Sequence, residues 1–243
     1  DALPISLMAR KKGTGGLTNL ERFGGTVFFV FYLLLLPLAA GPALRLLGQL
    51  LGRRLSENMG SAVYYYTLFA VTMILFHSLL GKTTRRFLHD PASALKTAGI
   101  GIVAYYGLCE LASRLGGLLS DRTANLNDSA ISSQIGSAPH MTLLIVIFLA
   151  PFVEETLFRG LVFGGLKEKS RALAYVVSCA LFALLHVWQF AVVNRDAAYF
   201  LLMVQYLIPG LILAWAYDHS GTLWASIGLH TGLNALSVLA GIS

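Results

Sequence analysis

The stretch FVEETLFRG, residues 152–160, places two adjacent carboxylates and an arginine inside a run of otherwise apolar residues. An ionised side chain at the centre of a membrane-spanning helix costs about 2.5–3.5 kcal/mol. Glu154, Glu155 and Arg159 are therefore expected to face the interior of a helix bundle and to find partners there, because lipid offers them none.

The composition of the whole chain indicates that such a bundle lies in a membrane. Of the 243 residues, 56% are hydrophobic and 12% are charged, and the mean hydropathy is +0.69. Soluble domains carry about 25% charged residues, and a span needs about 20 mainly apolar ones. We predict an all-α polytopic membrane bundle of seven transmembrane helices, with eight as the alternative count. The expected spans cover residues 23–44, 61–80, 98–119, 141–166, 172–193, 199–217 and 223–242, with Pro37 and Pro42 kinking or ending the first.

Residues 1–22 are read as a cytoplasmic N-terminal segment and residues 23–243 as a single integral membrane domain. Residues 1–7 carry no signal-peptide pattern, and we set them apart as an artefact before a natural start at Met8. Eleven Lys and Arg residues fall on the N-terminal side of the membrane and five on the other, which predicts a cytoplasmic N-terminus. This distribution also explains the net charge of +6 without a nucleic-acid partner. Cys109 and Cys179 form no CxxC pattern and are read as small buried hydrophobic residues.

Helix geometry separates the two glutamates of the opening stretch. Glu155 and Arg159 are four residues apart on one helical face, with the acid N-terminal to the base, which is the favourable order. Glu154 points about 100° away from Glu155, since an α-helix has 3.6 residues per turn. We therefore expect Glu155 to form a structural pair with Arg159 and Glu154 to face a polar cavity. In the simpler alternative, both glutamates only join neighbouring helices.

Two later spans carry polar residues at the same spacing of four. Residues 182–186, FALLH, contain Phe182 and His186, and residues 230–234, HTGLN, contain His230 and Asn234. A carboxylate shielded from water becomes a stronger base, so Glu154 could take a proton from a water molecule that His186 helps to hold. His230 and Asn234 could donate hydrogen bonds to the oxyanion that forms at an amide. The chain has neither G-x-S-x-G nor HExxH, which disfavours serine hydrolases of that type and HExxH zinc proteases.

The ordered set EETLFR, FALLH and HTGLN resembles the CPBP family of CAAX prenyl proteases and bacteriocin-processing or immunity proteins. The resemblance covers about residues 140–240. It implies an intramembrane protease in a bacterial plasma membrane, with its cavity open to the cytosol. Glu154 and His186 would activate water, and His230 and Asn234 would stabilise the oxyanion. Glu155 and Arg159 would be the supporting pair, and Phe182 belongs to the second motif.

The predicted function is an intramembrane endopeptidase that hydrolyses a peptide bond with glutamate-activated water and needs no cofactor. One alternative is a zinc-dependent form in which Glu154, His186 and His230 bind the metal. Others are a non-catalytic bacteriocin immunity or scaffold protein, and a transporter or proton relay. The expected partners are membrane lipid and a protein or peptide substrate, with a C-terminal or lipidated segment as one candidate. No nucleic-acid partner is expected, and the sequence sets no oligomeric state.

Overall fold

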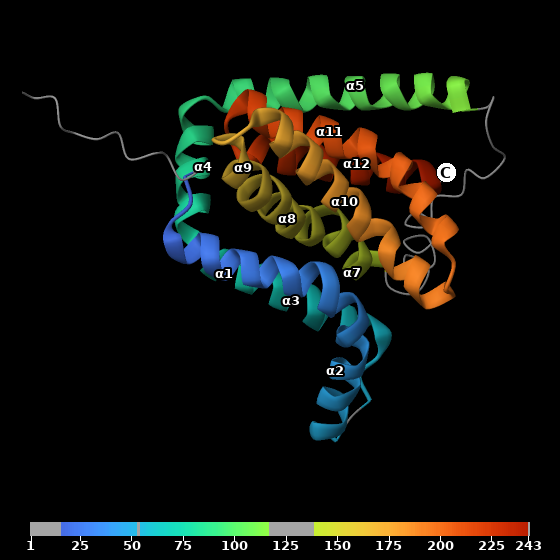
Figure 1. The fold of residues 1–243 in the computed structure, drawn as a ribbon. Helices are drawn as coiled ribbons and strands as arrows, with labels where there is room; N and C mark the ends of the chain where they lie inside the picture. The colour runs from blue at the N-terminus through green and yellow to red at the C-terminus, as the bar shows by residue number, and fades with distance from the viewer. Residues whose placement is uncertain (1–15, 53, 117–138, 243) are drawn as a thin grey trace, which may run out of the picture.

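The computed structural model describes residues 16–52, 54–116 and 139–242, and every regular element in these ranges is helical (Figure 1). The predicted all-helical membrane bundle is therefore confirmed. Five helices in these ranges are long and apolar enough to cross a membrane, or six if a sharply bent pair counts as one span. The chain is accordingly an integral membrane protein, while the count of seven spans stays a prediction.

The first span is one helical stretch that changes direction at a π-helical turn. α1 (Asn19–Val30) begins at a capping box formed by Thr18 and Glu21, four residues earlier than predicted. It passes through η1 (Phe31–Leu35) into α2 (Leu36–Leu50). Pro37 has no N–H to continue the α-helical ladder, and a π turn is one way in which a helix accommodates this loss. Figure 1 shows α2 turning away from the line of α1, as expected at the prolines, but the helix continues to Leu50.

The second predicted span is not one straight helix. α3 (Glu57–Leu75) and α4 (His77–His89) meet at 82°, with the fully buried Phe76 at the corner. The prediction of a continuous span to residue 80 is therefore wrong after residue 75. α4 lies across one end of the bundle (Figure 1).

α5 (Pro91–Gly116) carries the third predicted span and packs along α11 and α12 (Figure 1). It is not among the helices that meet the criteria of length and hydropathy for a membrane span. Residues 117–119 of that prediction lie outside the described residues, as does the polar segment that follows them.

A single helix from residue 139 to residue 167 forms the centre of the bundle, and we call it the central helix. It consists of α7 (Pro139–Leu144), η2 (Ile145–Leu149), α8 (Ala150–Glu155), η3 (Thr156–Phe163) and α9 (Gly164–Lys167). In its most apolar stretch 61% of the residues are buried, against 17–44% in the other four candidate spans. The sequence predicted this helix to within two residues.

The last three spans also lie where the sequence predicts them, to within three residues. They are α10 (Arg171–Asn194), η4 (Ala197–Leu202) continuing into α11 (Met203–Ser220), and α12 (Leu223–Ile242). Ser170 caps α10 by accepting a hydrogen bond from the N–H of Leu173. α11 ends at Gly221, whose φ of +69° is one that glycine adopts without strain.

Four hydrogen bonds join α4 to the start of α12, and we call this contact the threonine rim. Thr83 and Thr222 bond to each other through their hydroxyls at 3.0 Å, and the Thr222 hydroxyl also donates to the carbonyl of Thr83 at 3.0 Å. The N–H of Leu223 donates to the Thr83 hydroxyl at 2.6 Å, and the indole N–H of Trp224 donates to the hydroxyl of Thr84 at 2.9 Å. These bonds fix the end of the bundle where α4 lies.

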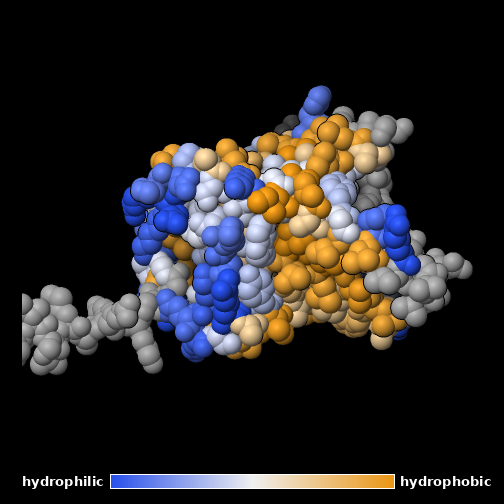
Figure 2. All heavy atoms as spheres, turned by 90° about the horizontal axis from the view of Figure 1, so that it is seen from above, coloured by the Kyte–Doolittle hydropathy of each residue, from blue (hydrophilic) through white to orange (hydrophobic). Residues whose placement is uncertain are grey.

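The surface agrees with a membrane setting. Figure 2 shows a broad apolar area on the face seen from above, with hydrophilic residues gathered at its left end and a smaller hydrophilic patch at its right. Cys109 is half-buried and Cys179 is buried, and both are free thiols, as expected. His77, His89, His140 and His219 are all exposed.

Candidate active site

The central helix directs its two glutamates to different sides. Glu155 is fully buried, and its Oε1 accepts a hydrogen bond from Nη1 of Arg159 at 3.0 Å. Glu154 is half-buried, and a hydroxyl of the first span, that of Tyr32, is hydrogen-bonded to it. This is the arrangement that the i, i+4 spacing predicts, with one glutamate in an ion pair and the other left for a different environment.

Arg159 joins three helices. Besides Glu155 on its own helix, its Nη2 donates to the carbonyl oxygen of Gly210 on α11 at 3.0 Å. Its guanidinium carbon lies 4.4 Å from the centre of the Phe182 ring on α10, a cation–π contact. The side chain is fully buried, so the carboxylate partner and these contacts replace the water that the charge has lost. Phe182 thereby acts as a support beneath the ion pair.

His230 on α12 binds the paired glutamate, and this contact could not be read from the sequence. Its Nδ1 lies 2.9 Å from Oε1 of Glu155, the oxygen that also accepts from Arg159. An ionised carboxylate oxygen can only accept, so Nδ1 carries the proton and Nε2 is the free ring nitrogen. A neutral His230 therefore presents an acceptor at Nε2, and only the imidazolium form presents a donor there.

His186 on α10 is held in the same tautomer by a backbone group. Its Nδ1 donates to the carbonyl oxygen of Phe182 at 2.8 Å, which again leaves Nε2 as the free nitrogen. The ring is stacked on Tyr206 of α11, with the ring centres 4.4 Å apart. His186 lies within electrostatic reach of both Glu154 and His230. The three motifs predicted to meet do lie together in the fold.

Asn234 forms a hydrogen bond to the backbone of the central helix. Its side-chain amide donates to the carbonyl oxygen of Val146 at 2.8 Å. In the η2 turn the N–H of Ala150 bonds to Ile145, and the next residue, Pro151, has no N–H. The carbonyl of Val146 is thus left without a helical partner, and Asn234 supplies one. One amide hydrogen of Asn234 remains for another acceptor.

Three tyrosines from the N-terminal helices interact with Glu154, and no sequence motif predicted them. Tyr32 of η1 forms the hydrogen bond, and Tyr64 and Tyr65 of α3 lie within electrostatic reach of the carboxylate. The only sequence signal for Tyr64 and Tyr65 was the run YYY at residues 64–66 in an apolar span. The polar surroundings expected for Glu154 therefore come in part from helices that the family motifs do not include.

The zinc alternative does not match the arrangement of the side chains. Among the residues that the structure describes, no group of three His, Cys, Asp or Glu side chains is placed to hold a metal ion. We therefore derive no catalytic step through a metal.

A family model matches the part of the chain that carries these motifs. The model of the type II CAAX prenyl endopeptidase Rce1-like family matches residues 136–236. The matched segment is similar to that family. It contains Glu154, Glu155, Arg159, Phe182, His186, His230 and Asn234, so the resemblance inferred from the three motifs is confirmed. The Rce1-like segment makes up less than half of the chain and leaves out α1, α3 and their tyrosines.

Two curated bacterial proteins are similar to the chain over 109 and 114 residues. "UPF0177 protein YxdF" of Lactococcus lactis subsp. lactis (strain IL1403) is 28% identical over 109 residues, which are 44% of this chain and 55% of the relative. "Putative membrane peptidase YdiL" of Bacillus subtilis (strain 168) is 28% identical over 114 residues, 46% of this chain and 42% of the relative. The chain thus spans about half the length of the curated relatives it matches. No solved structure matches the chain significantly.

Proposed function

We propose that the protein is an intramembrane endopeptidase in which Glu154 activates a water molecule, in the manner of CAAX proteases. The observation that carries the proposal is the position of Glu154 beside the pair Glu155–Arg159 but outside it, hydrogen-bonded to a tyrosine and within electrostatic reach of His186. The Rce1-like match and the peptidase name of one relative support the same reaction class.

In the proposed reaction, Glu154 takes a proton from water as the water oxygen bonds to the carbonyl carbon of the substrate. The free Nε2 of His186 accepts a hydrogen bond from the same water and orients it. The electrons of the carbonyl double bond move to its oxygen, which becomes an oxyanion. Glu154 then gives the proton to the departing amine as the C–N bond breaks, so the glutamate returns to its starting state.

The oxyanion needs donors, and the geometry restricts how the predicted ones can act. Asn234 keeps one amide hydrogen for this role, because the other bonds to Val146. His230 can donate only as an imidazolium, since its Nδ1–H is bound to Glu155. In the proposal, Glu155 orients His230 by accepting its Nδ1–H.

The test is hydrolysis of fluorogenic peptides by the purified full chain in liposomes, with Glu154→Gln as the main variant. We expect at least a 100-fold loss of rate, because general-base catalysis contributes about 10²–10⁴-fold. Glu110→Gln is the matched control, since Glu110 is an exposed carboxylate on α5 paired only with Arg114. Thermal unfolding checks that both variants are folded.

Full activity of Glu154→Gln would refute the proposal. Metal analysis and a chelator separate the zinc-dependent alternative, because loss of activity with the chelator and its return with zinc would support that form. If a cellular phenotype of the protein survives Glu154→Gln unchanged, the immunity or scaffold function replaces the enzymatic one.

A further inference from the structure

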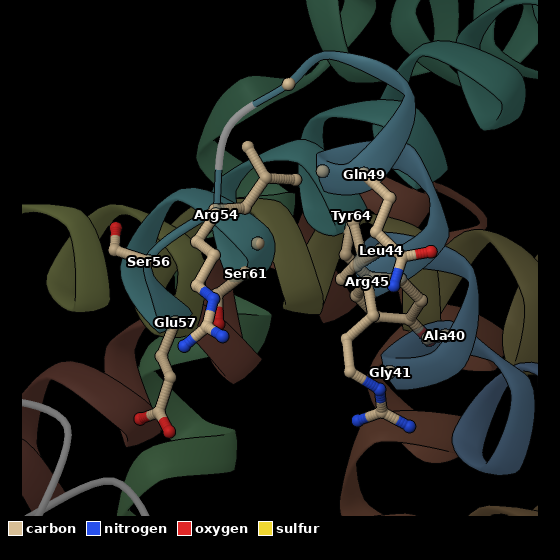
Figure 3. A pocket seen from close by; sticks show the side chains of 14 residues that line it. Ala40, Gly41, Leu44, Arg45, Gln49, Arg54, Ser56, Glu57, Ser61 and Tyr64 are labelled. Atoms are coloured by element: carbon tan, nitrogen blue, oxygen red, sulfur yellow. The ribbon is translucent and has the colours of Figure 1, made fainter.

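A cavity of about 870 Å³ lies at the far end of α2, between that helix and the start of α3 (Figure 3). α2 ends at Leu50 and α3 begins at Glu57, and small residues on each wall make the space. The walls include Gly48 and Gly60, both buried, and a methyl group at Gly60 would already lie 3.4 Å from Leu44. The volume is within the usual range of about 300–1,000 Å³ for ligand pockets.

Three charged side chains line this cavity. Arg45 comes from α2, and Arg54 and Glu57 come from the loop and the first residue of α3, on the opposite wall (Figure 3). All three are exposed, and within the described part of the chain none of them forms an ion pair. The cavity therefore presents two guanidinium groups and one carboxylate that are open to a ligand.

The position of the cavity indicates which ligand can reach it. α2 is the end of the candidate membrane span of residues 19–50, so the cavity lies at the level where a helix leaves the hydrocarbon core. Leu46, Leu50, Leu51 and Met59 around it are between 52% and 77% exposed. Lipid headgroups occupy this level of a bilayer, and the exposed apolar side chains would face the acyl chains below them.

We propose that this cavity binds the headgroup of an aminophospholipid, with the phosphate between Arg45 and Arg54 and the ammonium group at Glu57. Guanidinium groups match phosphate oxygens with paired hydrogen bonds. A primary ammonium group donates to a carboxylate, whereas the quaternary ammonium of choline has no N–H to donate. Tyr64 lines this cavity and also lies within electrostatic reach of Glu154, but lipid binding at the arginines does not depend on the proposed peptidase activity.

The test is native mass spectrometry of the full chain in detergent with phosphatidylethanolamine, phosphatidylcholine or phosphatidylglycerol of matched acyl chains. We expect phosphatidylethanolamine to bind best, and the double variant Arg45→Gln, Arg54→Gln to weaken its binding at least tenfold. Glu57→Gln should abolish the preference for phosphatidylethanolamine over phosphatidylglycerol while leaving phosphate binding in place. The exposed positions of the three side chains allow these changes without loss of fold.

Arg85→Gln, Arg86→Gln is the matched control, because it removes the same charge from exposed positions on α4. An equal loss of binding in the control would overturn the proposal, as would the absence of bound phospholipid on the unaltered protein. Glycerophosphoethanolamine and inorganic phosphate test the source of the phosphate. If either displaces the lipid fully at equal concentration, the cavity is a site for soluble phosphates and the lipid assignment is wrong.

Discussion

Arg159 links the buried Glu155 to two neighbouring helices. Its planar fork reaches Glu155 and the carbonyl of Gly210 at the same time, both at 3.0 Å, while its face lies on Phe182. The ammonium group of lysine is a compact charge at the end of a flexible chain and lacks the planar set of donors of a guanidinium group. Lysine at this position would keep the charge but could not serve both partners.

We expect Arg159→Lys to lower the free energy of unfolding by about 1–3 kcal/mol, because polar contacts between membrane helices contribute about 0.6–1.7 kcal/mol each. The measurement is unfolding of the purified protein in mixed micelles. Arg114→Lys is the control, because Arg114 pairs with Glu110 on the surface, with side chains 76% and 63% exposed. That exposed pair should change by less than about 1 kcal/mol. Equal shifts in the two variants would contradict the role given to Arg159.

The close approach of α1 to the corner between α3 and α4 depends on Gly25. A methyl group at this position would lie 2.6 Å from Cζ of Phe76 and 3.2 Å from Cδ1 of Leu161. Phe76 is fully buried at the 82° corner, so its ring has no room to move. The α1 helix would have to shift away from the bundle to admit the methyl group.

Gly25→Ala should therefore lower the melting temperature, with a loss of about 1–3 kcal/mol typical of overpacked cores. Gly107→Ala on α5 is the matched control, since nothing lies within 4 Å of a methyl group there. Alanine also favours helix over glycine by about 0.5–1 kcal/mol, so the control should be neutral or slightly stabilised. A destabilised Gly107→Ala with an unaffected Gly25→Ala would show that the packing argument fails.

The elements that the sequence predicted well are those whose ends carry local signals. The central helix and the three helices after it are long apolar runs bounded by Ser170, Asp196 and Gly221, which cap or end helices by their own chemistry. The corner at Phe76 has no proline or glycine, so tertiary packing sets it and the apolar pattern runs through it. The π turns before Pro37 and Pro151 follow from missing N–H groups, but proline alone does not say whether a helix bends or ends.

Three motifs of the candidate site and the contact within one helix could be predicted from the sequence, but the contacts between helices could not. The spacing of Glu155 and Arg159 fixes their meeting, because both lie on one helix. The hydrogen bond from His230 goes to Glu155 and not to Glu154. This choice depends on the rotation of α12 about its axis, which the HTGLN motif does not encode. The tyrosines around Glu154 come from distant helices, so their proximity arises only when the chain folds.

The topology of the chain depends on whether α5 crosses the membrane. It packs along α11 and α12, both of which are candidate spans, and this placement favours a crossing. If α5 crosses, residues 51 and 169 lie on opposite sides of the membrane. If it does not, an even number of crossings separates them and they lie on the same side.

Cysteine labelling decides between these topologies. In a background in which Cys109 and Cys179 are replaced by alanine, we expect Leu51→Cys and Lys169→Cys to react with a membrane-impermeant maleimide from opposite sides. Both positions are exposed, one on the loop after α2 and the other after α9. Labelling from the same side would remove α5 from the spans and leave six. The predicted cytoplasmic N-terminus adds that Lys169→Cys should react from the cytoplasmic side.

The threonine rim has a mechanical consequence for any traffic through the bundle. A sideways movement of α4 would break the four hydrogen bonds of the threonine rim together, and lipid could not replace them. α2, by contrast, packs against α3 and is joined to α10 by a hydrogen bond from the side-chain amide of Gln189 to the carbonyl oxygen of Pro37 at 2.9 Å. The end of the bundle at α4 is therefore the more firmly held of the two, and any sideways separation of helices wide enough for a polypeptide requires least work at α2.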